Sequence, residues 1–254
     1  MEQVIKKAKQ ANVTAISFVD HDTVAGWPEQ QRIAEAYGIQ AIPGIEISAY
    51  DFKRQRKVHI LGYHFNPAAP SITSLCKELL ELRHSHTLWQ MDQIKKAGFH
   101  LDAEAVIESA KPSATVYKQH IMQQLTDAPY MSDAYQFLYK SLFKGEGVAA
   151  GDIEYVAAED AVGAIVADGG LAVVAHPGQL DSYELIPELI GAGLGGIERN
   201  HFDHSAEDHR KVEELAQQYD LVMTGGSDFH GAFGTAIEPG DIVSPEDVNS
   251  VKRL

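Results

Sequence analysis

The feature that most constrains the fold of this chain is a series of six short apolar runs rich in β-branched residues. The runs span Ala15–Asp20, Ala41–Ser48, Lys57–Tyr63, Gly170–His176, Gly195–Asn200 and Leu221–Asp228. Their nearly continuous apolar character is typical of parallel strands that are covered on both faces. Helical patterns over residues 28–37, 158–168, 183–192 and 206–219 separate most of the runs, while residues 51–56 predict a hairpin-like connection. Alternating strands and helices indicate the α/β class, as a parallel barrel or a doubly wound sheet.

One stretch interrupts this alternation. From residue 67 to residue 152 the sequence carries helical patterns and almost no strand signal. These patterns cover residues 71–97, 103–109, 118–125 and 132–143. We therefore predict a helical insertion domain over residues 67–152, set within a barrel domain that is formed by residues 1–66 and 153–254.

The composition of the chain argues against several classes of protein, including duplex DNA-binding, disulfide-bonded and membrane-spanning proteins. The 36 acidic and 21 basic residues give a formal charge of -15, which disfavours duplex DNA as a partner because most of the surface repels phosphate. The single cysteine, Cys76, excludes an internal disulfide and a thiolate zinc cluster and fits a reducing compartment. No apolar run reaches the ~18 residues of a membrane span, and the amphipathic helix predicted over residues 2–10 lacks the apolar segment of a signal peptide. We expect a cytoplasmic protein with no membrane partner.

Residues able to bind metal stand on or just after almost every predicted strand. They are Asp20, His21, Asp22, Glu46, His59, His176, His201, Asp228 and His230. The carboxyl ends of barrel strands form the active-site face, where packing alone would favour Val, Ile or Gly. Any one of these histidines could be a structural residue, but the whole set predicts a site. Imidazole and carboxylate donors without thiolates suit Zn²⁺, Mn²⁺ or Fe²⁺, and a carboxylate such as Glu46 or Asp228 can bridge two ions.

The same residues lie in motifs of a known family. The run Ser17–Thr23, SFVDHDT, resembles the T-D-H-D-T motif of the polymerase and histidinol phosphatase (PHP) superfamily. Further matches follow in the family's order at Pro43–Ser48, His59–Tyr63, Ala175–Gly178 and Gly226–His230. The resemblance implies a distorted seven-stranded β/α barrel of the PHP type with up to three divalent metal ions. It is strongest to the phosphoesterases with an inserted helical domain, which include 3',5'-nucleoside bisphosphate phosphatases and a 5'-to-3' exoribonuclease on short RNA.

This resemblance also implies residue roles. The metal ligands that it implies are His21, Glu46, His59, His176, Asp228 and His230. The catalytic group comprises Asp20, His21, Glu46 and Asp228. Asp20 and Asp22 would fix the ring of His21, and the alternative for Asp22 is to cap the helix that follows.

A second group of residues would contact the substrate. Arg83 lies on the long predicted helix, and Lys118-Gln119-His120 resembles the family's R-P-H element with Lys and Gln replacing Arg and Pro. Lysine contacts a phosphate as a point charge, without the two-pronged geometry of arginine. The alternative for these three residues is a solvated helix face. His204 resembles a histidine that recurs after this strand in the family and is a further candidate for substrate contact.

The chain departs from the family at its start. Family members begin with a strand that carries His-x-His, followed by a loop with an acidic ligand, whereas residue 1 here falls inside the first predicted helix. We expect the first barrel strand to be missing together with its ligands, and fewer than three metal ions to bind. Pairing between two chains across the resulting gap would give a homodimer.

Three functions are then open. The first is a metal-dependent phosphoesterase that hydrolyses a phosphomonoester of a small nucleotide of the 3',5'-bisphosphate type, or short 5'-phosphorylated RNA, with activity impaired by the missing ligands. The second is a catalytically impaired PHP-type domain that binds metal or nucleotide. The third, a metal-dependent amidohydrolase, ranks last because no lysine ends a predicted strand.

Overall fold

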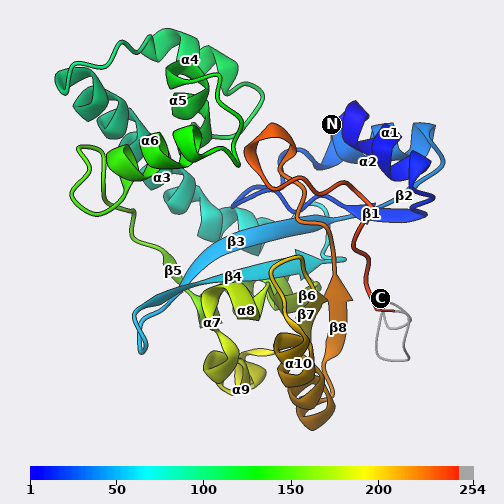
Figure 1. Ribbon diagram of the computed structural model, residues 1–254. Coiled ribbons are helices and arrows are strands. Elements are labelled where there is room, and N and C mark those ends of the chain that lie inside the picture. Colours follow the sequence, from blue (N-terminus) through cyan, green and yellow to red (C-terminus); the bar gives the residue numbers. More distant parts are fainter. Residues whose placement is uncertain (246–254) are drawn as a thin grey trace. The chain divides into compact units, whose positions relative to one another are not determined.

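The computed structural model describes residues 1–245, so residues 246–254 of the predicted barrel domain lie outside the described residues. The chain forms two compact units (Figure 1). Among the described residues, the first contains residues 1–76, 155–228 and 237–245. The second contains residues 77–154 and 229–236.

A mixed sheet is the centre of the first unit. Its strands are β3 (Gly44–Asp51), β4 (Arg56–Tyr63), β5 (Val156–Ala157), β6 (Leu171–Val174), β7 (Gly196–Asn200) and β8 (Val222–Gly225). Their order is β5-β3-β4-β6-β7-β8, and β4 runs antiparallel to both of its neighbours while the other pairs are parallel. The parallel pairing expected from the apolar runs holds for β3 with β5, β6 with β7 and β7 with β8, and β4 is the exception. The link over residues 51–56 is the predicted hairpin, and a link this short can only join antiparallel strands.

A smaller parallel sheet pairs β1 (Ala15–Ser17) with β2 (Gln40–Ile42). Helices α1 (Glu2–Gln10) and α2 (Trp27–Ala36) pack with it, and Ile5, Ile33 and Ile39 form its core. The single strand predicted over residues 41–48 is therefore two strands in two sheets. Pro43 stands between them, and its lack of an amide hydrogen interrupts a continuous ladder.

Helices cover one face of the mixed sheet (Figure 1). They include α7 (Ala158–Ala167), α8 (Pro177–Leu180), α9 (Ile186–Leu189) and α10 (Ala206–Tyr219). Ile45, Ile47 and Ile60 from the sheet share a buried core with Ile165 of α7. The continuous helix predicted over residues 183–192 is instead α9 flanked by two 3₁₀ turns, and Pro187 near the start of α9 removes a backbone donor there.

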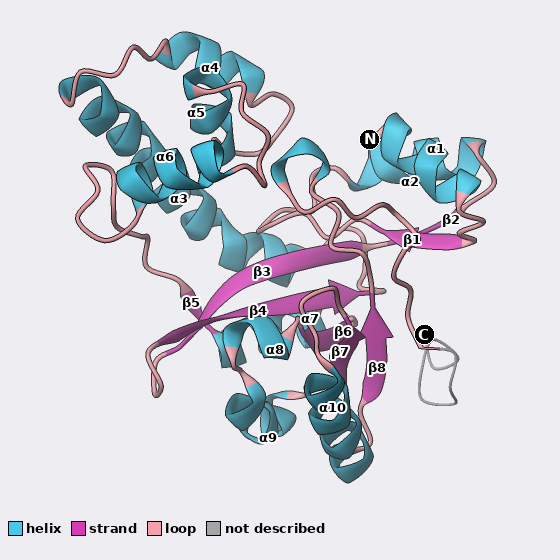
Figure 2. Cartoon of the chain, in the orientation of Figure 1, coloured by secondary structure: helices cyan, strands magenta, loops and turns pink. Residues whose placement is uncertain are grey.

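The second unit is helical (Figure 2). It contains α4 (Ala103–Ser109), α5 (Lys118–Leu125), α6 (Asp133–Phe143) and most of α3 (Pro70–Lys96), which begins in the first unit. Side chains that include Met91, Ile94 and Ile121 form its own core. The side chains of Asp102 and Ser132 cap α4 and α6, which explains why the sequence predicted these helix starts closely.

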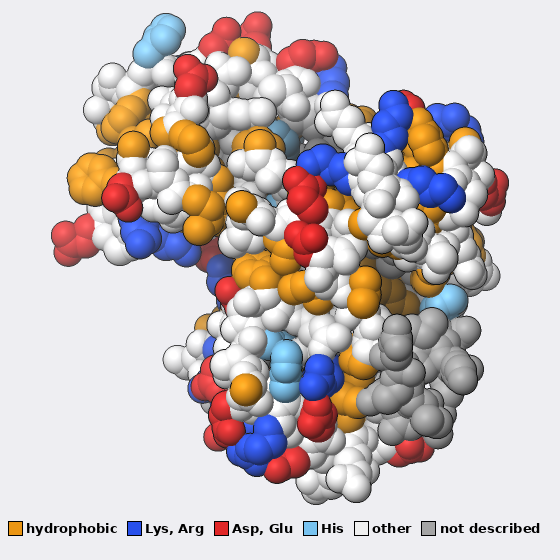
Figure 3. Space-filling view, turned by 45° about the vertical axis from the view of Figure 1, so that its right-hand side comes forward, with side chains coloured by type: hydrophobic (Ala, Val, Ile, Leu, Met, Phe, Trp, Pro, Cys, Tyr) orange, Lys and Arg blue, Asp and Glu red, His pale blue; other side chains and the backbone are white. Residues whose placement is uncertain are grey.

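Charges of both signs are intermixed on the face that Figure 3 shows. Several are paired, as in the contacts of Arg54 with Asp51, Glu184 and Glu188. Among the residues that the structure describes, no helix combines the length and the apolar character that a membrane span requires.

Candidate metal centre

Glu46, His59 and His176 bring three potential metal donors together. Along β3 and β4 the side chains alternate, so Glu46 and His59 point to the face of the sheet opposite Ile45, Ile47 and the helices. His176 follows the end of β6, the neighbour of β4. The Oε1 atom of Glu46 lies 2.6 Å from Nδ1 of His59 and 3.2 Å from Nε2 of His176, and these two nitrogens are 3.3 Å apart. The three side chains form one candidate site for a metal ion.

His21 approaches the same carboxylate from its other side. Its Nε2 lies 3.7 Å from Oε2 of Glu46, and its ring meets that of His59 edge-on, with centroids 5.2 Å apart. A backbone bridge between His21 and Glu46 ties the loop after β1 to β3. Glu46 therefore offers one oxygen to His59 and His176 and the other to His21, the arrangement of a carboxylate that can join two ion positions.

Electrostatics favours the ionised form of this carboxyl. Burial by itself would raise the pKa of Glu46, but the positive charges of His21 and His59 and hydrogen bonds from His176 and His59 hold that pKa well below its ordinary value. Burial by itself would lower the pKa of His176, but bonding to Glu46 raises it to about 9. A buried anion surrounded by imidazoles is a place where a bound cation can replace protons.

Four residues that follow strands have left-handed backbones, namely His64 after β4, with φ 55°, and three others. Asp22, His176 and Asp228 have φ values of 59°, 22° and 44°. L-residues other than Asn and Asp rarely adopt this region, and each such residue costs on the order of 1–3 kcal/mol unless its surroundings hold it. His176 is the strained residue of the three, because Asp adopts this region more readily, and strain of this kind collects at functional sites.

Asp20 and Asp22 have clear partners. The carboxylate of Asp22, fully buried, accepts hydrogen bonds from the backbone N–H of Ser48 at 2.7 Å and from its hydroxyl at 3.0 Å. Asp20 accepts a hydrogen bond from Gln30 at 2.8 Å, and burial raises the pKa of Asp20. Asp22 is not the cap of the following helix, because α2 starts at Trp27 behind Gly26. It joins the loop after β1 to β3 instead.

Asp228 lies beside a buried histidine. Nε2 of His201 is 3.4 Å from Oδ2 of Asp228, while Nδ1 of His201 accepts the backbone N–H of Asp203 at 3.2 Å. The second contact makes Nδ1 the acceptor, so in the neutral ring the hydrogen is on Nε2, which donates it to Asp228. His201 thereby orients the carboxylate that the sequence predicted as a metal ligand.

The predicted substrate-binding residues of the insertion are in the second unit. The Arg83 guanidinium carbon lies 5.4 Å from the centre of the Tyr117 ring. His120 closes a capping box at the start of α5, where its Nδ1 accepts the backbone N–H of Tyr117 at 3.0 Å. Its Nε2 therefore carries the hydrogen in the neutral ring. His230 belongs to this unit as well, and the ligand role of His230 and the phosphate roles of Arg83, Lys118 and His120 stay predictions.

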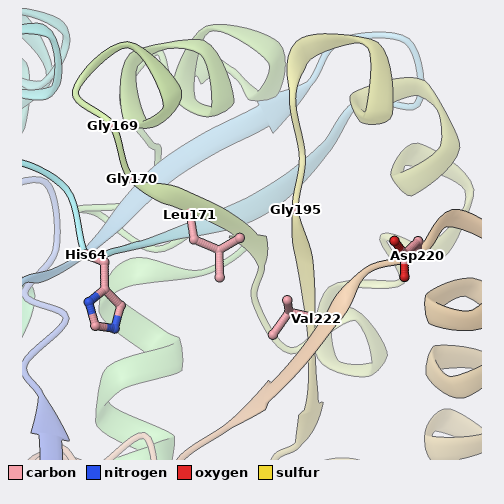
Figure 4. A pocket seen from close by; sticks show the side chains of 7 residues that line it. All are labelled: His64, Gly169, Gly170, Leu171, Gly195, Asp220 and Val222. Carbon is pink, nitrogen blue, oxygen red and sulfur yellow. The ribbon is translucent and has the colours of Figure 1, made fainter. Parts of the chain in front are cut away.

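A cavity of about 420 Å³ lies at the opposite ends of the strands (Figure 4). Leu171 and Val222, the first residues of β6 and β8, line it together with His64. His176 and Asp228 come after the same strands. The cavity is therefore separate from the candidate metal site.

Known proteins share both sequence and fold with this chain. No protein-family model matches it. It is 52% identical over 233 residues to the phosphoribosyl 1,2-cyclic phosphate 1,2-diphosphodiesterase of Eggerthella lenta, which covers 92% of this chain and 89% of that protein. It is 30% identical to the 3',5'-nucleoside bisphosphate phosphatase of Chromobacterium violaceum, over 90% of this chain and 81% of the relative.

Solved structures of other proteins have the same fold as this chain. A Bifidobacterium adolescentis protein described as a metal-dependent phosphoesterase superposes with a TM-score of 0.85 at 24% identity, over 96% of this chain and 87% of that one. An amidohydrolase of Chromobacterium violaceum, solved with bound sulfate and no metal, gives a TM-score of 0.78 at 28% identity, over 89% and 81% of the two chains. The chain belongs to the PHP-type metal-dependent phosphoesterases. It is a hydrolase with the α/β fold of that family, as the motifs predicted.

The donor geometry fits the metal that a PHP-type enzyme requires. Ligand atoms about 2.0–2.1 Å from a tetrahedral ion lie about 3.3 Å from one another. Two of the three separations, 3.2 Å from Glu46 to His176 and 3.3 Å from His59 to His176, match that value, while Glu46 and His59 are at the hydrogen-bond distance of 2.6 Å. Two nitrogens and a carboxylate oxygen, without sulfur, form a donor set for Zn²⁺, Mn²⁺ or Fe²⁺.

Two residues on or after β7, His204 and Glu198, contact the backbone of this PHP-type site. Nε2 of His204 accepts the backbone N–H of Gly178 at 3.1 Å and its Nδ1 donates to the carbonyl of Arg199 at 2.7 Å. Both ring nitrogens thus hold the backbone here, and substrate contact by His204 stays a prediction. Sequence reasoning missed Glu198, a carboxylate only 5% exposed whose Oε2 accepts the backbone N–H of His176 at 2.8 Å. A charged residue inside an apolar strand was the signal that could have found it.

Proposed function

We propose that this chain hydrolyses a phosphate ester of a small phosphorylated ribose compound, with a phosphoribosyl cyclic phosphate as the first candidate. The observation that carries the proposal is the cluster of Glu46 on β3, His59 on β4 and His176 after β6, gathered on one face of the sheet in a PHP-type fold. The choice of substrate follows the relative from Eggerthella lenta, which is 52% identical over 92% of this chain and whose name specifies a phosphoribosyl 1,2-cyclic phosphate.

The residues of the cluster have distinct tasks in this proposal. Bound Mn²⁺, Zn²⁺ or Fe²⁺ would activate water as a nucleophile and neutralise phosphate charge. Glu46, His59 and His176 would hold an ion through a carboxylate oxygen and two ring nitrogens, and His21, beside the other oxygen of Glu46, would be a further ligand. Asp228, oriented by His201, adds a further carboxylate.

Hydrolysis of a cyclic phosphate requires no reactant other than water. In the opening of a cyclic diester, one water adds to phosphorus and one bond between phosphorus and a sugar oxygen breaks. One proton of the water goes to the released sugar hydroxyl, and a phosphomonoester remains on the other sugar oxygen. Buried carboxylates and imidazoles at the cluster can take up and return this proton.

Residues of the second unit are proposed to hold a substrate phosphate. Arg83 and Lys118 supply positive charge, and His120 supplies a ring N–H because its Nδ1 is engaged by Tyr117. Burial lowers the pKa of His120, so the ring is a neutral donor near pH 7. Such a donor recognises a phosphate oxygen without adding charge.

A nucleotide is the second candidate substrate. The relative from Chromobacterium violaceum, 30% identical, is named as a 3',5'-nucleoside bisphosphate phosphatase, and the sequence motifs pointed to the same substrate class and to short 5'-phosphorylated RNA. A bisphosphate would present one phosphate to the metal cluster and a second to cationic residues.

Metal loading and a substrate panel test the proposal. The chain is loaded with Mn²⁺ and incubated with a phosphoribosyl cyclic phosphate, adenosine 3',5'-bisphosphate and a short 5'-phosphorylated RNA, and the products are followed by ³¹P NMR. We expect the cyclic phosphate to react fastest. A faster reaction of the bisphosphate or the RNA would select the second candidate. Metal binding without hydrolysis of any ester would favour the catalytically impaired binding domain.

Two further expectations accompany this function. A single, buried Cys76 fits a cytoplasmic enzyme, because a reducing compartment keeps such a thiol free. The homodimer is tested by sedimentation velocity, in which a monomer at micromolar concentration would contradict it.

A further inference from the structure

Glu198 is a buried carboxylate that the proposed chemistry does not use. It lies on β7, next to β6, and is 5% exposed. Its Oε2 accepts the backbone N–H of His176 at 2.8 Å. An ionisable residue in the middle of a sheet is costly to bury, so its retention calls for a specific partner.

That partner has an unusual backbone. His176 has φ 22° and ψ 61°, in the left-handed region, where its side chain is disfavoured. Its N–H is directed at Glu198, and without that acceptor a buried donor would be unpaired. The hydrogen bond therefore holds the conformation that sends the His176 ring toward Glu46.

The ring is bonded through Nε2 alone, which contacts Glu46 at 3.2 Å and His59 at 3.3 Å, the side where a metal ion would bind. A histidine that ligates metal through one nitrogen ordinarily donates the other N–H to a carboxylate, a carbonyl or water. Within residues 1–245, Nδ1 of His176 is buried and has no hydrogen-bond partner. On the side away from the Glu46 contact, the ring is held by its backbone and by packing against the rings of His59 and His201, with centroids 5.1 Å away in both cases.

We infer that Glu198 is the positioning residue of the metal site, because it anchors the left-handed backbone of His176 and so fixes Nε2 of His176 beside Glu46. The inference rests on the metal site of the proposed function. Glu198 acts through the backbone of a ligand, in place of the ring-to-carboxylate bond that usually orients a ligating histidine.

Metal affinity tests this role apart from turnover. Apo protein is titrated with Mn²⁺, and free Mn²⁺ is measured by electron paramagnetic resonance. Glu198→Ala should weaken binding about 10- to 100-fold, the usual cost of losing a group that orients a ligand. Glu198→Gln keeps an oxygen that can accept from His176, so it should weaken binding less than about 3-fold. Glu198→Asp keeps the charge but withdraws the oxygen, and should behave like the alanine variant.

Asp168 offers a matched control. It is also buried, at 7% exposure, and accepts the backbone N–H groups of Ser71 at 3.1 Å and Ile72 at 2.9 Å. It precedes β6, whereas His176 follows that strand. Asp168→Ala should lower the melting temperature and leave Mn²⁺ affinity unchanged.

The outcomes separate this inference from the proposed function. Affinity equal to wild type in Glu198→Ala or Glu198→Asp would overturn the positioning role and leave the metal site intact. Equal losses in the Asp168 and Glu198 variants would also overturn it, because general destabilisation would then explain both. If Glu198→Ala does not fold, Glu198→Asp and Glu198→Gln decide by the same comparison. No Mn²⁺ binding by the wild-type chain would overturn the proposed function together with this inference.

Discussion

Replacing Asp22 by alanine should destabilise the first unit by about 4 kcal/mol. Its carboxylate is fully buried and accepts both the backbone N–H and the hydroxyl of Ser48, at 2.7 and 3.0 Å. A hydrogen bond to a charged group contributes about 1.5–3 kcal/mol, and losing it leaves the Ser48 N–H buried and unpaired. Residue 22 also has φ 59°, a conformation that alanine adopts at a cost of about 1 kcal/mol.

Two further variants separate the contributions to the free-energy cost of Asp22→Ala. Asp22→Asn keeps an oxygen for the Ser48 N–H and tolerates the left-handed backbone, so it should cost only about 1 kcal/mol. Ser48→Ala removes the hydroxyl and leaves the backbone contact, so it should also cost about 1 kcal/mol.

Urea unfolding in metal-free buffer measures the effect. The chain has two tryptophans, Trp27 in the first unit and Trp89 in the second. In a Trp89→Phe background, the fluorescence of Trp27 reports on the first unit alone. Arg32→Ala on the same helix is the control, because its ion pair with Glu29 is exposed and should contribute less than about 0.5 kcal/mol. The reasoning is wrong if Asp22→Ala costs less than about 1 kcal/mol, or if Asp22→Asn costs as much as Asp22→Ala.

Three more predictions concern the cluster, the substrate and pH. His176→Ala should lower the metal content measured by mass spectrometry and abolish phosphoesterase activity, since it removes a donor to the ion; unchanged stoichiometry would contradict the assigned site. His120→Ala should raise KM for a bisphosphate more than for a simple monoester, and equal effects would return His120 to a solvated helix face. Hydrogen bonds from Ser205 and Tyr183 lower the pKa of Asp208. Their stabilisation is present above the ordinary pKa of about 3.9 and is lost as pH falls toward the folded-state value, so the stability gap between wild type and Asp208→Asn should shrink below about pH 4.

The sequence alone predicted the elements whose signals are local. The helices over residues 2–10 and 206–219 have the predicted bounds, and α10 begins with a capping box of Ser205 and Asp208. The motif residues identified the family, since ligand types and their order along the chain are properties of sequence. They also named Glu46, His59 and His176, which the fold brings within 3.3 Å of one another.

Tertiary structure decided everything that depends on contacts between distant residues. The sequence predicted the hairpin over residues 51–56, but the pairing of β4 with β6 on its other side joins residues more than 100 positions apart. The division of the segment 41–48 between two sheets likewise depends on which strands lie beside each half. The bond between Glu198 and His176 joins residues 22 positions apart, and the left-handed backbone of His176 is stable only because that bond and its packing exist. No local pattern in the sequence encodes such a conformation, because the free energy that holds it comes from neighbours that only folding brings together.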